Sequence, residues 1–219
     1  MADPHYRLVV FDWDGTLIDS ASAIIECIQQ SACEMGLRVP ARERASHVIG
    51  LGLHDSLRHA VPELRREGYD EFASLYRKHF LAREDAMLPF PGARELLAEL
   101  EAQGRWLAIA TGKSRRGLDR ALDANGLRKH FVASRCADET HPKPHPAMLE
   151  ELSGELGVAL QAVLMVGDTT HDLEMASRAN VDAVAVTYGA HPAASLRALA
   201  PRALVGSVAE LRAWLQANA

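Results

Sequence analysis

Short apolar runs alternate with helical segments along most of this sequence. The clearest runs of four or five apolar residues lie at 8–11, 106–110, 162–166 and 183–186, with a weaker one at 131–133. The segments between and after these runs have helical patterns, at 92–103, 114–125, 145–157, 171–180 and 207–217. Parallel strands need a crossover connection, usually a helix. The alternation therefore predicts an α/β fold, a doubly wound parallel sheet with helices on both faces.

One long segment breaks this alternation. Residues 20–88 have helical patterns and no convincing strand, with expected helices at about 24–36, 53–60 and 69–87. Proline and glycine residues then mark the return to the strand–helix pattern. We therefore expect two units, of which the first is an α/β core of residues 1–18 and 89–219. The second is a helical cap domain of residues 19–88, inserted after the first strand.

Composition and charge exclude several classes of protein. The 219 residues are 48% hydrophobic and 24% charged, as in a globular protein and unlike a disordered or fibrous one. A net charge of −5 without a basic run argues against nucleic acid as a partner. No stretch approaches 18 apolar residues and no leader-like segment opens the chain, so we expect no membrane association and a cytoplasmic location. Cys27, Cys33 and Cys136 form no disulfide or metal pattern, which fits a reducing compartment.

Two of the apolar runs end in pairs of aspartates. Asp12 and Asp14 follow the first run, and alternate residues of a strand share a face, so both carboxylates can point the same way. Asp168 and Asp172 follow a later run and open a helix, where a cap and a first-turn charge are the simpler alternative. If all four meet at one sheet edge, carboxylates about 4 Å apart repel by about 4 kcal/mol at an effective dielectric of about 20. Such an edge requires a cation or a shared proton, and oxygen ligands that leave positions open for water and phosphate suit Mg²⁺.

Two further segments carry groups that bind anions. Thr111 and Gly112 end the second run and begin a helix, so a hydroxyl and free backbone N–H groups meet at a helix N-terminus. Lys143 lies between two prolines in a chain with only four lysines, although a solvated charge is the ordinary alternative for such a residue. Three histidines have no standard metal-ligand spacing and are expected on loops or the rim of the site: His141, His145 and His171.

Together these segments resemble the four motifs of the haloacid dehalogenase superfamily. The pattern Asp-x-Asp-Gly-Thr begins at Asp12, Thr-Gly ends the second run, Lys143 precedes a proline, and Gly-Asp-x-x-x-Asp begins at Gly167. Order and spacing match over nearly the whole chain. The helical insertion resembles the small cap of phosphoglycolate phosphatase-like and β-phosphoglucomutase-like members. The resemblance implies a Mg²⁺-dependent phosphatase that acts on a small phosphorylated metabolite.

The resemblance also implies a role for each motif residue. Asp12 is the expected nucleophile, which takes the phosphoryl group as an aspartyl-phosphate. Asp14 is expected to protonate the leaving oxygen and then to activate water. Mg²⁺ is expected to bind the Asp12 carboxylate, the Asp14 backbone carbonyl and Asp168. Asp172 is expected to orient the lysine or a metal-bound water. The groups expected to bind the phosphoryl oxygens are Thr111, the Gly112 N–H and Lys143.

Three features of the sequence argue against other activities known in the superfamily. Asp14 is present, whereas dehalogenases of the superfamily usually lack this second aspartate. β-Phosphoglucomutase-like caps carry basic residues where this chain has Ile49 and Leu53, and a single cap lysine, Lys78, does not favour a Schiff-base mechanism. A phosphomutase stays open as an alternative, as does a non-catalytic interaction protein on the same fold. The intact carboxylates and Lys143 argue against the non-catalytic alternative.

The cap sequence indicates the size of the substrate. Its expected cleft-facing loop, residues 50–53, carries no charge and has two glycines, which allow close backbone approach and leave little room for a nucleotide or a protein loop. His54 and Arg58 lie one helical turn apart; they either face the cleft and attract an anionic leaving group or are solvated on the outer face. We expect small phosphomonoesters, with phosphoglycolate as the best single candidate, and do not choose between a monomer and a homodimer.

Overall fold

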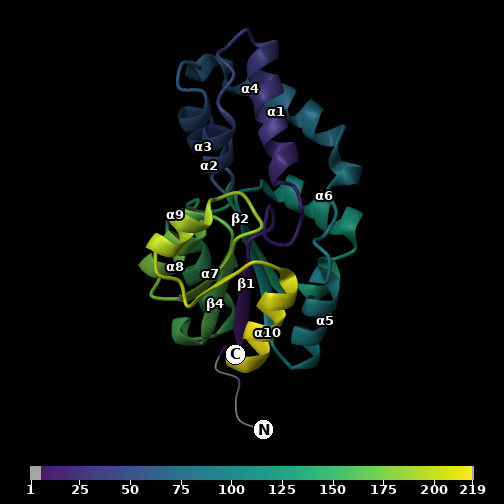
Figure 1. The fold of residues 1–219 in the computed structure, drawn as a ribbon, viewed down its shortest axis with the longest axis vertical. Coiled ribbons are helices and arrows are strands. Elements are labelled where there is room, and N and C mark those ends of the chain that lie inside the picture. Colours follow the sequence, from purple (N-terminus) through teal and green to yellow (C-terminus); the bar gives the residue numbers. More distant parts are fainter. Residues whose placement is uncertain (1–5, 219) are drawn as a thin grey trace.

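A sheet of six parallel strands forms the centre of the molecule, in the order β3-β2-β1-β4-β5-β6 (Figure 1). The structure is a computed structural model that describes residues 6–218. Its strands are β1 (Leu8–Phe11), β2 (Trp106–Thr111), β3 (Ala133–Cys136), β4 (Val163–Gly167), β5 (Asp182–Val186) and β6 (Ala203–Val205). The predicted doubly wound α/β fold is confirmed.

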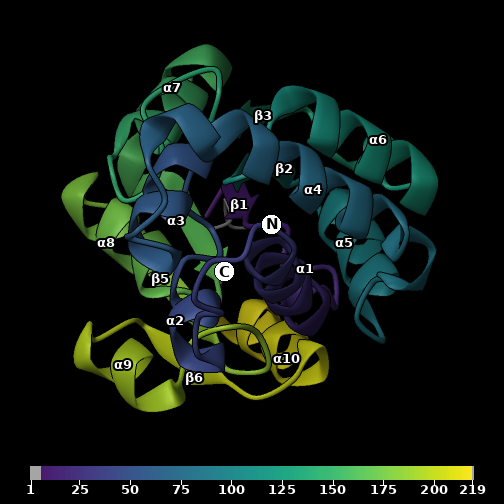
Figure 2. The ribbon, with the colours of Figure 1, turned by 90° about the horizontal axis from the view of Figure 1, so that it is seen from above.

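Alternate strand residues face two different layers of helices, which explains why the runs are apolar at every position. In β1, Val9 and Phe11 belong to one hydrophobic cluster, and Leu8 and Val10 belong to the other. Figure 2 shows the layers from above. The first cluster includes residues of α5 (Ala93–Ala102), α6 (Arg115–Asn125) and α10 (Val208–Asn218). The second includes residues of α7 (Ala147–Leu156), α8 (Thr170–Arg178) and α9 (Ala193–Ala198).

The helical insertion lies above the carboxyl edge of the sheet, at the top of Figure 1. It consists of α1 (Ala21–Glu34), α2 (Arg42–His47), α3 (Leu53–Ala60) and α4 (Tyr69–Leu81), and α1 packs along α4. The two chain segments that join it to the core run side by side. Ile18 bridges to both Asp14 and Pro89, and the amide of Asp19 donates to the carbonyl of Leu88 at 2.9 Å.

Several short elements differ from those expected from the sequence. The helices α2 and α9 have six residues each and β6 has three, so none is long enough to show a clear period. The expected strand at 131–133 is shifted to Ala133–Cys136, because the preceding residues form a 3₁₀ turn. The helix expected at 69–87 ends at Leu81. The 3₁₀ turns are η1 (Arg66–Gly68), η2 (Glu84–Ala86), η3 (Arg128–His130) and η4 (Leu160–Ala162). Within residues 6–218, no helix combines the length and apolarity needed to cross a membrane.

Candidate active site

The three central strands deliver polar residues to one edge of the sheet. Asp12 directly follows β1, Thr111 ends β2, and Asp168 directly follows β4. Because β1 pairs with both β2 and β4, these residues come from neighbouring strand ends. The amide of Asp12 donates to the carbonyl of Val166 at 2.9 Å, which extends the β1–β4 pairing to the first aspartate. All three side chains are buried.

Three carboxylates form a buried acidic cluster at this edge. One oxygen from each of Asp12, Asp168 and Asp172 lies within 4.8 Å of the others. Asp168 accepts from the Thr16 hydroxyl and from the Ala190 amide, both at 2.7 Å. Burial, together with the charges of Asp12 and Asp172, raises the pKa of Asp168 well above its ordinary value. The protein therefore holds negative charge where a cation would stabilise it.

Lys143 neutralises part of this charge. Its ammonium nitrogen lies 2.8 Å from Asp12 Oδ1 and 2.6 Å from Asp172 Oδ1. Burial opposes the charge on Lys143, but the two adjoining carboxylates outweigh it and raise the pKa of this lysine. Lys143 is thus a buried cation of the site, and the alternative that it is a solvated surface charge is wrong.

The second oxygen of Asp12 has no such partner. Oδ2 is buried and accepts no hydrogen bond from any residue the structure describes. Burial raises the pKa of Asp12 to about 7, against the opposing effect of Lys143. A buried polar atom without a partner is rare and requires an explanation. A divalent cation shared with Asp168, or an incoming phosphoryl group, would supply the missing interaction.

Asp14 lies outside the acidic cluster and is held by different groups. It accepts from the Ser20 hydroxyl at 2.8 Å, and Lys113 Nζ donates to its two oxygens at 2.9 and 2.8 Å. Lys113 Nζ also lies 4.6 Å from the centre of the Phe80 ring, on the helical insertion. No sequence pattern predicts a role for Lys113 or Ser20. The position of Lys113 directly after the Thr-Gly pair was the available signal.

Asp172 has the arrangement of a supporting residue. It completes the capping box of α8, in which its Oδ2 accepts from the Thr169 amide at 3.0 Å and from the Thr169 hydroxyl at 2.7 Å. Its other oxygen binds Lys143. The simpler expectation that Asp168 caps this helix is wrong, because Thr169 occupies the cap position. Asp168 therefore does not cap α8, and its carboxylate lies in the acidic cluster.

The loop of the insertion around Gly50 lies against the segment that contains Thr111 and Gly112. A side chain at Gly112 would begin only 2.6 Å from the carbonyl oxygen of Gly50, so only glycine allows this approach. Ser114 caps α6 and accepts from the Gly117 amide at 3.3 Å. The N-terminus of α6 therefore lies directly below the loop around Gly50.

A cavity of about 280 Å³ lies between the insertion and the core. Asp12, Asp14, Thr111 and Gly112 line its floor. Its walls are mostly apolar, and the cations that line it besides Lys113 are Arg77 and Arg120. The apolar side chains come from α1, α3 and α4 and include Ile24, Ile28, Leu57, Phe72, Tyr76 and Phe80.

His54 and Arg58 do not face the cavity, so the alternative in which they attract an anionic leaving group is wrong. Neither residue lines the cavity; both are exposed, and Arg58 pairs with Asp55 at 2.9 Å on the outer face of α3. The second alternative, solvation on the outer face, is the one observed. The expectation for His171 is also wrong, because this residue is buried on α8. His141 and His145 pair with each other, with ring centres 4.4 Å apart.

The chain is similar in sequence to a known hydrolase family and to proteins named as phosphatases. The family described as haloacid dehalogenase-like hydrolase matches residues 9–186. A protein named probable phosphatase IndB from Dickeya dadantii is 35% identical over 210 residues, which cover 93% of this chain and 91% of that protein. A phosphoglycolate phosphatase from Yersinia pseudotuberculosis is 29% identical, covering 94% and 91% of the two chains.

Solved structures show the same architecture. The crystal structure of a predicted phosphoglycolate phosphatase from Haemophilus somnus has a TM-score of 0.85 and 25% sequence identity, covering 94% of this chain and 96% of that one. The residues that match the family model, 9–186, extend from β1 to the end of β5 and therefore include all four motifs and the insertion. The chain belongs to the haloacid dehalogenase-like hydrolase family.

Proposed function

We propose that this protein is a Mg²⁺-dependent phosphatase that hydrolyses small phosphomonoesters through an aspartyl-phosphate on Asp12. The observation that carries the proposal is Asp12 itself. One of its oxygens pairs with Lys143, and the other is buried without a partner among the described residues, at a cavity between the insertion and the core. Phosphatases are named among the relatives, which agrees with this chemistry.

The metal would be held by Asp12, Asp168 and the backbone carbonyl of Asp14. When bound, Mg²⁺ would neutralise the acidic cluster and draw charge from the phosphoryl oxygens. Asp172 is better suited to holding Lys143, because both of its oxygens already accept hydrogen bonds. The donor set is entirely oxygen, which favours Mg²⁺ over softer ions.

The phosphoryl group would lie between the Asp12 carboxylate and the start of α6. Thr111, the Gly112 amide and Lys143 would bind its oxygens, where negative charge spreads in the transition state. Ser20 and Lys113 orient Asp14 at the wall of the same cavity. From there Asp14 would protonate the leaving oxygen and later take a proton from the attacking water.

The helical insertion, residues 19–88, would act as a cap over this reaction. The close approach of Gly50 to Gly112 shuts the site from solvent on that side. A closed cap excludes water while the phosphoryl group is transferred to Asp12. The cavity favours a small leaving group with an apolar part, since hydrocarbon covers most of its wall. Ile49 and Leu53 line the wall where a mutase-like cap would carry basic residues.

A phosphomonoester panel with Mg²⁺ tests the proposal. It would include phosphoglycolate, small alkyl and aryl phosphates, hexose phosphates and nucleotides, with release of inorganic phosphate as the readout. We expect small phosphomonoesters to give the highest kcat/KM values. Higher values for nucleotides or phosphoproteins than for every small ester would contradict the substrate class. Isomerisation of a hexose phosphate without net phosphate release would identify a mutase instead.

A further inference from the structure

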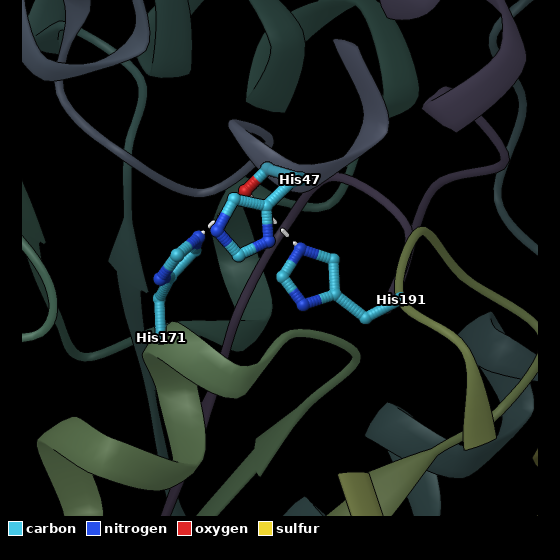
Figure 3. Close-up of side chains that lie close together, drawn as sticks. All are labelled: His47, His171 and His191. Atoms are coloured by element: carbon cyan, nitrogen blue, oxygen red, sulfur yellow. Dashed lines mark hydrogen bonds between the residues drawn. The ribbon is translucent and has the colours of Figure 1, made fainter. Parts of the chain in front are cut away.

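A second group of ligand-type side chains lies beside the catalytic edge, and we call it the histidine cluster. It consists of His47, His171 and His191, which converge from three separate segments (Figure 3). His47 is the last residue of α2 in the insertion, His171 is the second residue of α8, and His191 lies between β5 and α9. The cluster therefore joins the insertion to the core. None of these residues has a part in the proposed phosphatase reaction.

The spacing of the three rings fits a shared metal ion. Their ring centres are 5.2 Å apart for His47 and His171, 5.2 Å for His47 and His191, and 5.1 Å for His171 and His191. A zinc ion bound at about 2.0–2.1 Å by three histidines at tetrahedral angles places their ring centres about 5.2 Å apart. One nitrogen from each ring already lies within 4.8 Å of the others, against about 3.4 Å in such a site. Binding would therefore require the three rings to turn toward the ion.

The hydrogen bonds show where the rings point. His171 Nε2 lies 2.7 Å, and His191 Nε2 3.3 Å, from a single acceptor, the backbone carbonyl oxygen of His47. The Thr170 amide donates to His191 Nδ1 at 3.0 Å, so this ring is neutral, the form that binds metals. The ring of His47 is exposed and makes no hydrogen bond to any residue in the described range 6–218. Two Nε2 atoms thus point at one carbonyl oxygen, beside an imidazole ring that has no hydrogen-bond partner among the described residues.

Binding would rearrange these hydrogen bonds. The proton on His191 Nε2 would move to Nδ1, which would end the hydrogen bond that the Thr170 amide donates to this atom and would leave the Thr170 hydroxyl, 3.3 Å away, as the acceptor. A hydrogen bond of this kind to the outer nitrogen is usual for metal-binding histidines. A cleft beside His47 and His191, lined also by Asp19 and Glu43, gives an ion and a fourth, water ligand access to the cluster.

We propose that His47, His171 and His191 form a Zn²⁺-binding site that fastens the insertion to the core. Imidazole nitrogen selects zinc and similar transition ions, whereas the carboxylate cluster nearby selects Mg²⁺. The bond to His47 would add to the hydrogen bond by which Ser46 Oγ donates to the carbonyl of Ala190 at 2.6 Å. Zinc bound here would stabilise the closed position of the insertion over the active site.

Cobalt binding in the presence of excess Mg²⁺ tests the site without relying on activity. Mg²⁺ keeps the carboxylate cluster occupied, and Co²⁺ with three nitrogen ligands in a tetrahedral site absorbs visible light far more strongly than octahedral Co²⁺ on oxygen. We expect this absorption to saturate at one equivalent in the full-length protein and to disappear when one equivalent of Zn²⁺ is added. His47→Ala should weaken Co²⁺ binding by more than about 10-fold, because even outer partners of a metal site contribute about that much.

The matched control is His59→Ala, which removes an exposed histidine from α3 of the same insertion. It should leave the cobalt absorption unchanged, and His191→Gln should lose it as His47→Ala does. A wild-type protein without the tetrahedral absorption, or a His47→Ala variant that keeps it, would overturn the site. Hydrogen exchange tests the fastening separately: Zn²⁺ should protect the amides of α2 in the wild type and not in His47→Ala. Zinc binding without this protection would overturn the link between site and closure.

Discussion

The carboxylate cluster and the histidine cluster meet at the start of α8 but are built in different ways. Asp12, Asp168 and Asp172 all belong to the core, are fully buried and hold an excess of negative charge around one lysine. The histidine cluster is neutral at His191 and takes His47 from the insertion. The core alone therefore assembles the carboxylates and the lysine of the proposed phosphatase site, whereas the histidine cluster requires the insertion to pack on the core.

The largest expected effect comes from removing the nucleophile. Asp12→Asn keeps the shape of the side chain but takes away the attacking carboxylate, so we expect kcat to fall by at least about 10³-fold. Phosphate release from the best substrate of the panel measures it, and circular dichroism checks the fold. The control Asp70→Asn changes an exposed carboxylate on α4 and should keep wild-type kcat. Wild-type turnover by Asp12→Asn, with deamidation excluded by mass spectrometry, would contradict the mechanism.

The next effect separates two members of the carboxylate cluster. Asp168→Asn should weaken Mg²⁺ binding by about 10²-fold, because it removes a charged ligand from a site of few charges. Asp172→Asn should weaken it much less, since its oxygens already bind Lys143 and Thr169. Isothermal titration with Mg²⁺ measures both. Equal losses in the two variants would show that Asp172 binds the metal directly. EDTA should stop hydrolysis, Mg²⁺ should restore it, and Ca²⁺ should not.

A smaller effect is expected where the core meets the insertion at Asp14. Lys113→Gln removes the ion pair that orients Asp14 but leaves the carboxylate and its hydrogen bond from Ser20. We therefore expect kcat to fall by about 10-fold to 10²-fold, less than the loss of a whole general acid or base, which contributes about 10²-fold to 10⁴-fold. Metal binding should stay unchanged, because the Asp14 carboxylate lies outside the acidic cluster. Lys129→Gln, on an exposed turn, is the matched control. An Lys113→Gln variant with wild-type kcat at all pH values would show that Ser20 alone orients Asp14.

The smallest effect is on stability and pH in the metal-free protein. The pKa of Asp12 is raised to about 7 by burial, against an ordinary value near 3.9 in the unfolded chain. At Asp12 the folded state therefore binds more protons between these values, so ionisation of this residue removes stability as pH rises from about 4 to about 7. Burial lowers the pKa of His191 to about 4, and this shift acts in the opposite direction, so thermal unfolding in EDTA must compare the wild type with Asp12→Asn. The stability of the wild type relative to Asp12→Asn should fall over this range, and added Mg²⁺ should reduce the fall. A relative stability that stays constant or rises would contradict the buried, uncompensated charge.

The sequence predicted that Asp12 and Asp168 meet because each directly follows a recognisable buried strand, whereas it placed Asp14 in the same group and the structure does not. Asp12, Thr111 and Asp168 lie at the ends of three apolar runs, and parallel strands bring such ends to one edge. Nothing comparable marks the histidine cluster. His47 ends a helix too short to show a period, and His191 lies in a connection between β5 and α9. Their meeting depends on how the insertion packs on the core.

Partners of the motif residues were missed for a related reason. Lys113, Ser20 and Thr16 hydrogen-bond to the motif aspartates, but lysine, serine and threonine near a turn are ordinary in any sequence. These contacts follow from distances that only the folded chain supplies. The apolar wall of the cavity is a further example, since the sequence pattern of its residues indicates helix core, whereas in the structure they line the cavity.

Trapping the phosphorylated enzyme tests the central claim most directly. Substrate is mixed with enzyme and Mg²⁺, the reaction is quenched in acid within the first turnover, and peptides are analysed by mass spectrometry. Asp14→Asn is included with an aryl phosphate as the substrate, because this leaving group needs little help from a proton on Asp14, whereas hydrolysis of the intermediate should be slowed. The account predicts phosphate on the peptide that contains Asp12 in both proteins, with more of it in Asp14→Asn. Release of the leaving group by Asp14→Asn with no phosphate on Asp12, or with phosphate on another residue, would contradict the account.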